Sequence, residues 1–80
     1  MSGVNPPLTC KEVKRTLKSL GFTYRNTEGS HENWVRDEPK PFRKVTVDCP
    51  KAPFSQILIE LMARQAGMSK KEFYAAFRKI

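Results

Sequence analysis

Apolar residues recur every three to four positions in three stretches of the chain, and this spacing predicts three helices. The first helix is expected to begin after Thr9, because Thr9 and Glu12 have the spacing of a capping box. Gly21 is expected to end this helix in a left-handed conformation. The buried stripe is predicted to consist of Val13, Leu17 and Leu20.

Two further helices are predicted in the last third of the chain. Ser55 is the expected N-cap of the longer one, and Gly67 ends it. The apolar face that should cover a sheet consists of Phe54, Ile57, Leu58, Leu61 and Met62. Ser69 and Glu72 form a second capping box, which begins a short last helix. The buried stripe of that helix is predicted to be Phe73, Phe77 and Ile80.

Between the first and second helices, alternating apolar and polar residues predict three strands. A short strand is expected at 22–24 before a turn at 26–29, a second at about 31–37, and a third at 43–49. Short turns between successive strands are typical of an antiparallel meander. The predicted fold class is therefore α+β, with a helix, a three-stranded antiparallel sheet, a helix and a short C-terminal helix.

The second strand has two faces, and its orientation decides where the only histidine points. Trp34 lies on one face, and His31 and Val35 lie on the other. If Trp34 packs under the helices, His31 faces outward, whereas packing of Val35 would turn it inward. We favour packing of Trp34, because an indole buries more area than a valine. Lys44 and Thr46 are then expected as neighbours of His31.

The length of 80 residues is that of one small domain. Residues 1–8 contain two prolines and no periodicity, so they are predicted to be a flexible N-terminal segment before a single domain at 9–80. The start of the chain lacks the basic and apolar parts of a signal peptide, and no apolar run has the length of a membrane span. We therefore expect a cytoplasmic protein that does not enter a membrane.

Charge and cysteine content narrow the possible partners. The chain has 15 Lys and Arg against 8 Asp and Glu, which gives a net charge of +7. Such an excess attracts polyanions, above all nucleic acid, although it can also serve solubility alone. Cys10 and Cys49, with one histidine, are too few for a zinc site, so we expect no metal and no cofactor. Both thiols are expected to be reduced.

The candidate chemistry centres on His31, which follows Gly29 and Ser30. Histidine can donate or accept a proton near neutral pH, and RNA supplies its own nucleophile in the 2′-hydroxyl group. The amides of Gly29 and Ser30 could stabilise charge on phosphoryl oxygens. Further RNA-binding residues are expected to be Lys44, then Arg25, and on the basic face of the first helix Lys14 and Lys11. That basic face can equally be an ordinary solvated surface.

Residues 9–80 resemble the HicA family of toxin mRNA interferases. The resemblance depends on the helix that ends at Gly21-Phe22, the triplet Gly29-Ser30-His31 at a fixed distance after it, and the segment from Gly67 to Phe73. It implies a fold like that of double-stranded-RNA-binding domains and metal-independent endoribonuclease activity on mRNA. It also implies that His31 is catalytic and that a HicB-like antitoxin covers the active surface.

Other functions fit parts of the sequence. A module of the same fold can bind RNA without cleaving it. Residues 63–69 have the spacing of a helix-turn-helix, which would bind DNA with the nearby cations Lys70, Lys71, Arg78 and Lys79. A third possibility is a purely structural partner of an antitoxin-like protein.

Overall fold

Capping residues set the bounds of the helices in the computed structural model, which describes residues 5–80. The helices are α1 (Cys10–Ser19), α2 (Gln56–Gln65) and α3 (Lys70–Arg78). Thr9, Ser55 and Ser69 are their N-caps, and each side chain accepts a hydrogen bond from the backbone N–H three residues further on. Gly21 and Gly67 follow α1 and α2 with positive φ angles, which confirms the predicted helix ends.

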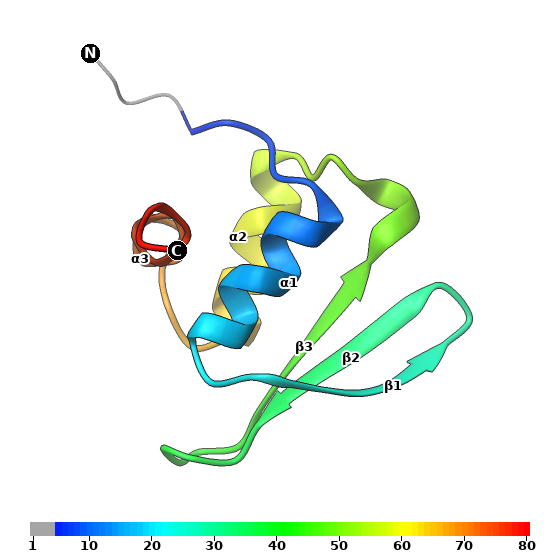
Figure 1. Cartoon of the computed structure of the whole chain (residues 1–80), viewed down its shortest axis with the longest axis vertical. Coiled ribbons are helices and arrows are strands. Elements are labelled where there is room, and N and C mark those ends of the chain that lie inside the picture. The colour runs from blue at the N-terminus through cyan, green and yellow to red at the C-terminus, as the bar shows by residue number, and fades with distance from the viewer. Residues whose placement is uncertain (1–4) are drawn as a thin grey trace.

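The strands form one antiparallel sheet in the order β1-β2-β3 (Figure 1). They are β1 (Thr23–Glu28), β2 (His31–Arg36) and β3 (Arg43–Asp48). The α+β layout is therefore as predicted. The turn predicted at 26–29 is wrong, because β1 pairs with β2 as far as Glu28 and His31 and only Gly29 and Ser30 remain between the strands. Pairing with β2 overrides the turn preference of these polar residues.

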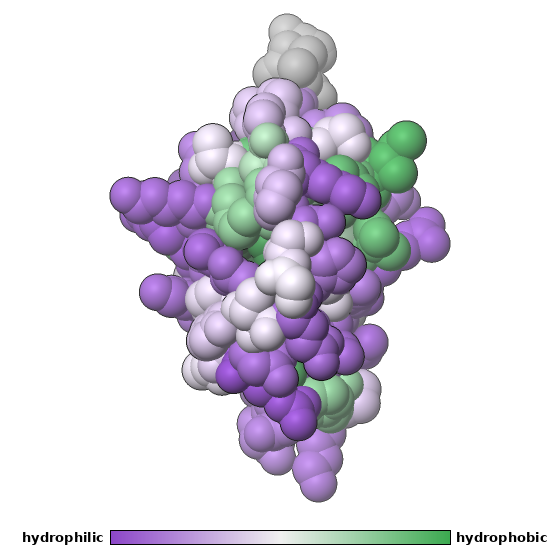
Figure 2. Space-filling view, turned by 90° about the vertical axis from the view of Figure 1, so that its right-hand side faces the viewer, coloured by the Kyte–Doolittle hydropathy of each residue, from purple (hydrophilic) through white to green (hydrophobic). Residues whose placement is uncertain are grey.

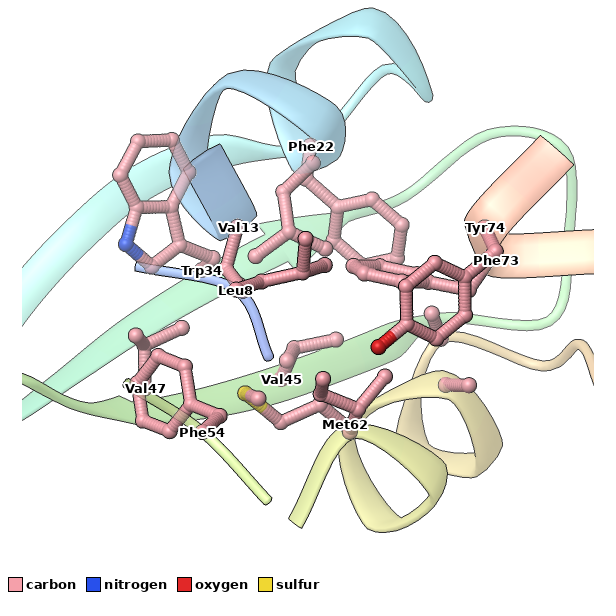
Figure 3. Packing of buried hydrophobic residues seen from close by; sticks show 14 residues of the cluster. Leu8, Val13, Phe22, Trp34, Val45, Val47, Phe54, Met62, Phe73 and Tyr74 are labelled. Carbon is pink, nitrogen blue, oxygen red and sulfur yellow. The ribbon is translucent and has the colours of Figure 1, made fainter. Parts of the chain in front are cut away.

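One face of the sheet packs under the helices and forms the core. Figure 3 shows Val13 of α1, Trp34 of β2, Val45 of β3, Met62 of α2 and Phe73 of α3 meeting in one cluster. Trp34 is only 4% exposed. This confirms the prediction that Trp34 faces the helices, and alternation along β2 then directs His31 to the opposite face.

The predicted buried face of α2 is wrong in part. Ile57 is 80% exposed and Leu61 is 52% exposed, whereas Ile59 and Ala63 are buried. The periodicity could not select the face, because apolar residues occur on all sides of this short helix. Contact with β3 determines which face of α2 is buried. The Gln65 side-chain oxygen accepts a hydrogen bond from the backbone N–H of Thr46 at 3.1 Å.

The stripe predicted for α3 is also partly wrong. Phe73 is buried as predicted, but Phe77 is half-buried and Ile80 is 44% exposed. Tyr74 is fully buried instead. α3 packs against α1 and α2 rather than on the sheet, so its buried face is set by the two other helices.

Residues 5–8 pack against the domain, although they belong to the segment predicted to be flexible. Leu8 is fully buried, and its carbonyl oxygen accepts a hydrogen bond from the backbone N–H of Phe54 at 2.8 Å. The Asn5 carbonyl oxygen accepts one from the side chain of Gln56 at 3.1 Å. Residues 1–4 of that segment lie outside the described residues.

Cys10 and Cys49 form a disulfide, which corrects the prediction of two reduced thiols. They are 39 residues apart in sequence, but their Cα atoms are separated by 5.2 Å. The fold brings the first residue of α1 beside the end of β3, and spacing along the chain does not reveal this proximity. In residues 5–80, no helix combines the length and the apolar character needed to cross a membrane.

The hydroxyl of Tyr74 supports the N-terminal segment. It donates a hydrogen bond to the Pro6 carbonyl oxygen and accepts one from Gln56 at 3.0 Å. We expect Tyr74→Phe to lower the free energy of unfolding by about 1–3 kcal/mol, because it removes two hydrogen bonds made by a fully buried side chain. Urea denaturation measures this loss. Tyr24→Phe is the matched control, because the Tyr24 hydroxyl is bonded at an exposed site; equal losses in both variants would contradict the prediction.

Candidate functional site

The sheet face opposite the core carries rows of mostly polar side chains. Because side chains alternate along each strand, the pairing register determines which residues share this outer face. Successive rows across the strands contain Glu28, His31 and Asp48; then Asn26, Asn33 and Thr46; then Thr23, Val35 and Lys44. The helices pack on the other side of the sheet, except that α2 also lies along the edge of β3, where its side chains line a pocket with Thr46 and Asp48 (Figure 1). Away from that edge, the described helices leave the outer face open.

His31 lies at the first position of β2, directly after the turn, and its side chain is 55% exposed. Its Nε2 atom is 3.4 Å from an Asp48 carboxylate oxygen. The Lys51 ammonium group lies 3.9 Å from the same oxygen. Because Asp48 faces Nε2, the other ring nitrogen, Nδ1, is left for a ligand. A carboxylate in this place can orient the imidazole.

Asp48 is a site residue that sequence reasoning missed. The strand pattern already placed it on the outward face of β3, and in a meander the end of β3 lies opposite the start of β2. Counting residues along β2 and β3 from the turn between them could therefore have paired Asp48 with His31. Lys51, in the short 3-10 helix at Cys49–Lys51, gave no comparable signal, because its position depends on the bend after β3.

Lys44 is not the neighbour of His31 that the sequence suggested. It pairs with Val35, four positions along the sheet from the row of His31, which corresponds to about 13 Å at the rise of a strand. Thr46 lies one row from His31 and lines the same pocket. The expected pairing of Lys44 with His31 is therefore wrong in register.

Lys14 and Lys11 are on α1, which packs on the core side of the sheet. The Lys14 ammonium group is 3.3 Å from a carboxylate oxygen of Glu32. Glu32 follows His31 on β2, so its side chain points to the opposite face. Lys11 is exposed on the same helix. The structure therefore separates these two cations from the imidazole of His31.

A pocket of about 320 Å³ lies between α2 and β3 beside His31. Asp48 and Lys51 contribute polar groups to it, and Leu58 and Leu61 of α2 contribute apolar surface. Apolar walls with a few converging polar groups are typical of small-ligand sites. The pocket is large enough for a small organic group beside His31.

Arg25 reaches the outer face through a β-bulge. The pairing of β1 with β2 shifts by one residue between Tyr24 and Asn26, which leaves Arg25 as the extra residue. Arg25 and Lys44 then line one polar hollow of about 190 Å³. Of the predicted RNA-binding side chains, the structure thus brings these two together.

Gly29 and Ser30 form the exposed turn that precedes His31. Gly29 has a φ angle of +63°, a conformation that glycine adopts at little cost. A side chain at this position would meet no neighbouring atom within 4 Å, so the conformation rather than space favours glycine. Both residues directly precede His31, so their backbone amides are close to it along the chain.

Comparison of the chain with models of protein families, with curated proteins and with solved structures found no match. The side chains of this sheet face are therefore the structural basis for a function. Two features stand out on this face. One is the pair formed by His31 and Asp48 beside a pocket, and the other is the hollow at the bulge.

Proposed function

We propose that this protein is a HicA-like toxin, a metal-independent endoribonuclease that cleaves mRNA with His31 as general acid or base. The observation that carries the proposal is an exposed imidazole beside Asp48, at the edge of a pocket on the polar face of the sheet. The net charge of +7 supports a polyanionic substrate. The triplet Gly29-Ser30-His31, in its family-like position, supports the same activity.

The proposed reaction uses the 2′-hydroxyl group of RNA as nucleophile. His31 accepts the hydroxyl proton at Nδ1 while the oxygen bonds to the adjacent phosphorus, and the bond from phosphorus to the 5′-oxygen breaks. The products are a 2′,3′-cyclic phosphate and a 5′-hydroxyl group, whose proton comes from water, and the imidazolium ion then returns its proton to the hydroxide that is left. Asp48 stabilises the imidazolium ion that forms. The amides of Gly29 and Ser30, together with Lys51, are available to the phosphoryl oxygens.

A HicB-like antitoxin is the proposed protein partner. Ile57 and Leu61 on α2 are exposed, and Leu61 also lines the pocket beside His31. Figure 2 shows a mainly hydrophilic surface with a hydrophobic group at its upper right, the side on which α2 lies. Exposed apolar side chains of this kind are typical of protein contacts. A partner that covers them would also close the site around His31.

RNA binding without cleavage is the second candidate function. It is favoured by the cations of α1, which lie on the other side of the sheet from His31 and so do not depend on its chemistry. The helix-turn-helix alternative has less support. α2 and α3 are joined by a short turn at Gly67, but DNA binding through α3 leaves the polar sheet face without a role.

A comparison of substrates tests the proposed chemistry. The purified 80-residue chain is incubated in EDTA with a single-stranded RNA and with the same RNA sequence carrying 2′-O-methyl groups. We expect cleavage of the unmodified RNA alone, with products that end in 2′,3′-cyclic phosphates, because the methyl group removes the nucleophile. Gel electrophoresis and mass spectrometry of the products measure this. Cleavage of both substrates would contradict the mechanism, and binding without cleavage of either would favour the second candidate.

A further inference from the structure

We propose that the hollow at the bulge of β1 binds an unpaired guanine base next to the phosphate that His31 acts on. This inference rests on the proposed function and adds the base that the site recognises. Its elements are the carboxylate of Glu28, a buried amide at Asn33, and the cations Arg25 and Lys44.

Asn33 makes the floor of the hollow rigid. It is 6% exposed. Its side-chain nitrogen donates to the Asn26 side-chain oxygen at 2.9 Å and, more weakly, to a Glu28 carboxylate oxygen at 3.4 Å. Its side-chain oxygen accepts from the Thr46 hydroxyl at 3.4 Å. These bonds connect all three strands and hold Asn26 and Glu28 in place before a ligand arrives.

The polar groups around this floor retain free bonding capacity. A carboxylate has room for about four hydrogen bonds, and the contact from Asn33 uses one such position on Glu28. Arg25 and Lys44 form no ion pair within residues 5–80. The hollow therefore presents a carboxylate acceptor and two unpaired cations to the same small volume.

This set of groups fits a base better than a phosphate. Arg25 and Lys44 would attract a phosphate, but an ionised phosphate has no donor for the Glu28 carboxylate, whereas a base carries both donors and acceptors on its edges. Two carboxylate oxygens match two adjacent N–H donors. Among the four RNA bases, only the Watson–Crick edge of guanine has two adjacent donors, N1–H and the N2 amino group. The guanine O6 and N7 atoms accept hydrogen bonds from arginine or lysine. Arg25 can also stack its planar guanidinium group on the ring.

The register of the sheet fixes where this base lies relative to the reaction. Glu28 and His31 are direct partners in the pairing of β1 with β2. Asn33, at the floor of the hollow, lies two residues beyond His31 on the same face, which is about 7 Å along the strand. One nucleotide spans a comparable length. The recognised guanine is therefore adjacent to the cleaved bond.

The test measures binding of short single-stranded RNAs that differ only in one central base. The protein carries His31→Gln in every case, so that the RNA stays intact, and affinity is measured by fluorescence anisotropy. We expect the RNA with guanine to bind on the order of tenfold more tightly than those with adenine, cytosine or uracil. Inosine, which lacks the N2 amino group, should lose most of this preference.

Glu28→Gln should abolish the preference for guanine over uracil. The ratio of the two affinities is the readout, because removal of a negative charge strengthens binding of every RNA. Glu38→Gln is the matched control, since Glu38 is exposed in the turn between β2 and β3 and its replacement makes the same charge change. This control should keep the full preference.

Each outcome separates the two proposals. RNA binding without preference for guanine, or a preference that survives Glu28→Gln, overturns the guanine site and leaves the ribonuclease proposal standing. Absence of binding to every RNA overturns both. Circular dichroism of the Glu28→Gln variant verifies that the fold is intact, which is expected because the Glu28 side chain is exposed.

Discussion

Replacement of His31 by glutamine is expected to lower the rate of RNA cleavage by about 10²- to 10⁴-fold, the usual contribution of a general acid or base. Glutamine retains hydrogen-bonding groups but cannot exchange a proton near neutral pH. RNA affinity should change by less than about threefold, because the cations and amides around the site remain. Single-turnover cleavage and anisotropy measurements on the same RNA separate the two effects.

Lys44→Gln is the matched control for this experiment. Lys44 lies on the same sheet face but in another row from His31, so its loss should weaken RNA binding and leave the rate at saturating enzyme unchanged. In cells, we expect growth arrest and loss of messages with the natural chain and neither with His31→Gln. If the His31→Gln variant cleaves RNA at the rate of the natural chain, His31 is not the general acid or base.

Loss of the disulfide is expected to produce the largest change in stability. The bond between Cys10 and Cys49 closes a loop with a sequence separation of 39 residues. The chain-entropy relation gives about 4 kcal/mol for a loop of this length. Small domains are stabilised by only about 5–15 kcal/mol in total. We therefore expect the double variant Cys10→Ser, Cys49→Ser to unfold at a much lower urea concentration.

Dithiothreitol supplies the control for this prediction. The reductant should lower the urea midpoint of the natural chain towards that of the double variant, and it should leave the variant unchanged. Thiol titration of the folded and the denatured chain counts the free cysteines in parallel. Equal midpoints for the natural chain with and without reductant would show that the bond does not stabilise the domain.

Local signals explain why so much of the fold was predictable. The capping boxes at Thr9 and Ser69 begin helices because each supplies partners for backbone N–H groups within three residues. The alternation around Trp34 determined which face of β2 is buried, because the indole has much more apolar area to bury than the other candidates. In both cases, the interacting groups are close in sequence.

The candidate site was only partly predictable, because several of its contacts join residues that are far apart in sequence. The position of His31 after the turn and its outward orientation followed from the sequence. The pairing of His31 with Asp48 required the register of β2 against β3. The approach of Arg25 to Lys44 required a bulge that shifts one residue of β1, and no local pattern specifies such a shift.

The sequence by itself determined the order of helices and strands, the helix ends and the side of the sheet to which His31 belongs. Capping, glycine conformation and strand alternation act over a few residues, so they can be read along the chain. Only the tertiary structure decided the disulfide, the buried face of α2, the partner of His31 and the hollow at the bulge. Each of these depends on how elements that are distant in sequence pack together, and packing selects among faces and registers that the local pattern leaves equally possible.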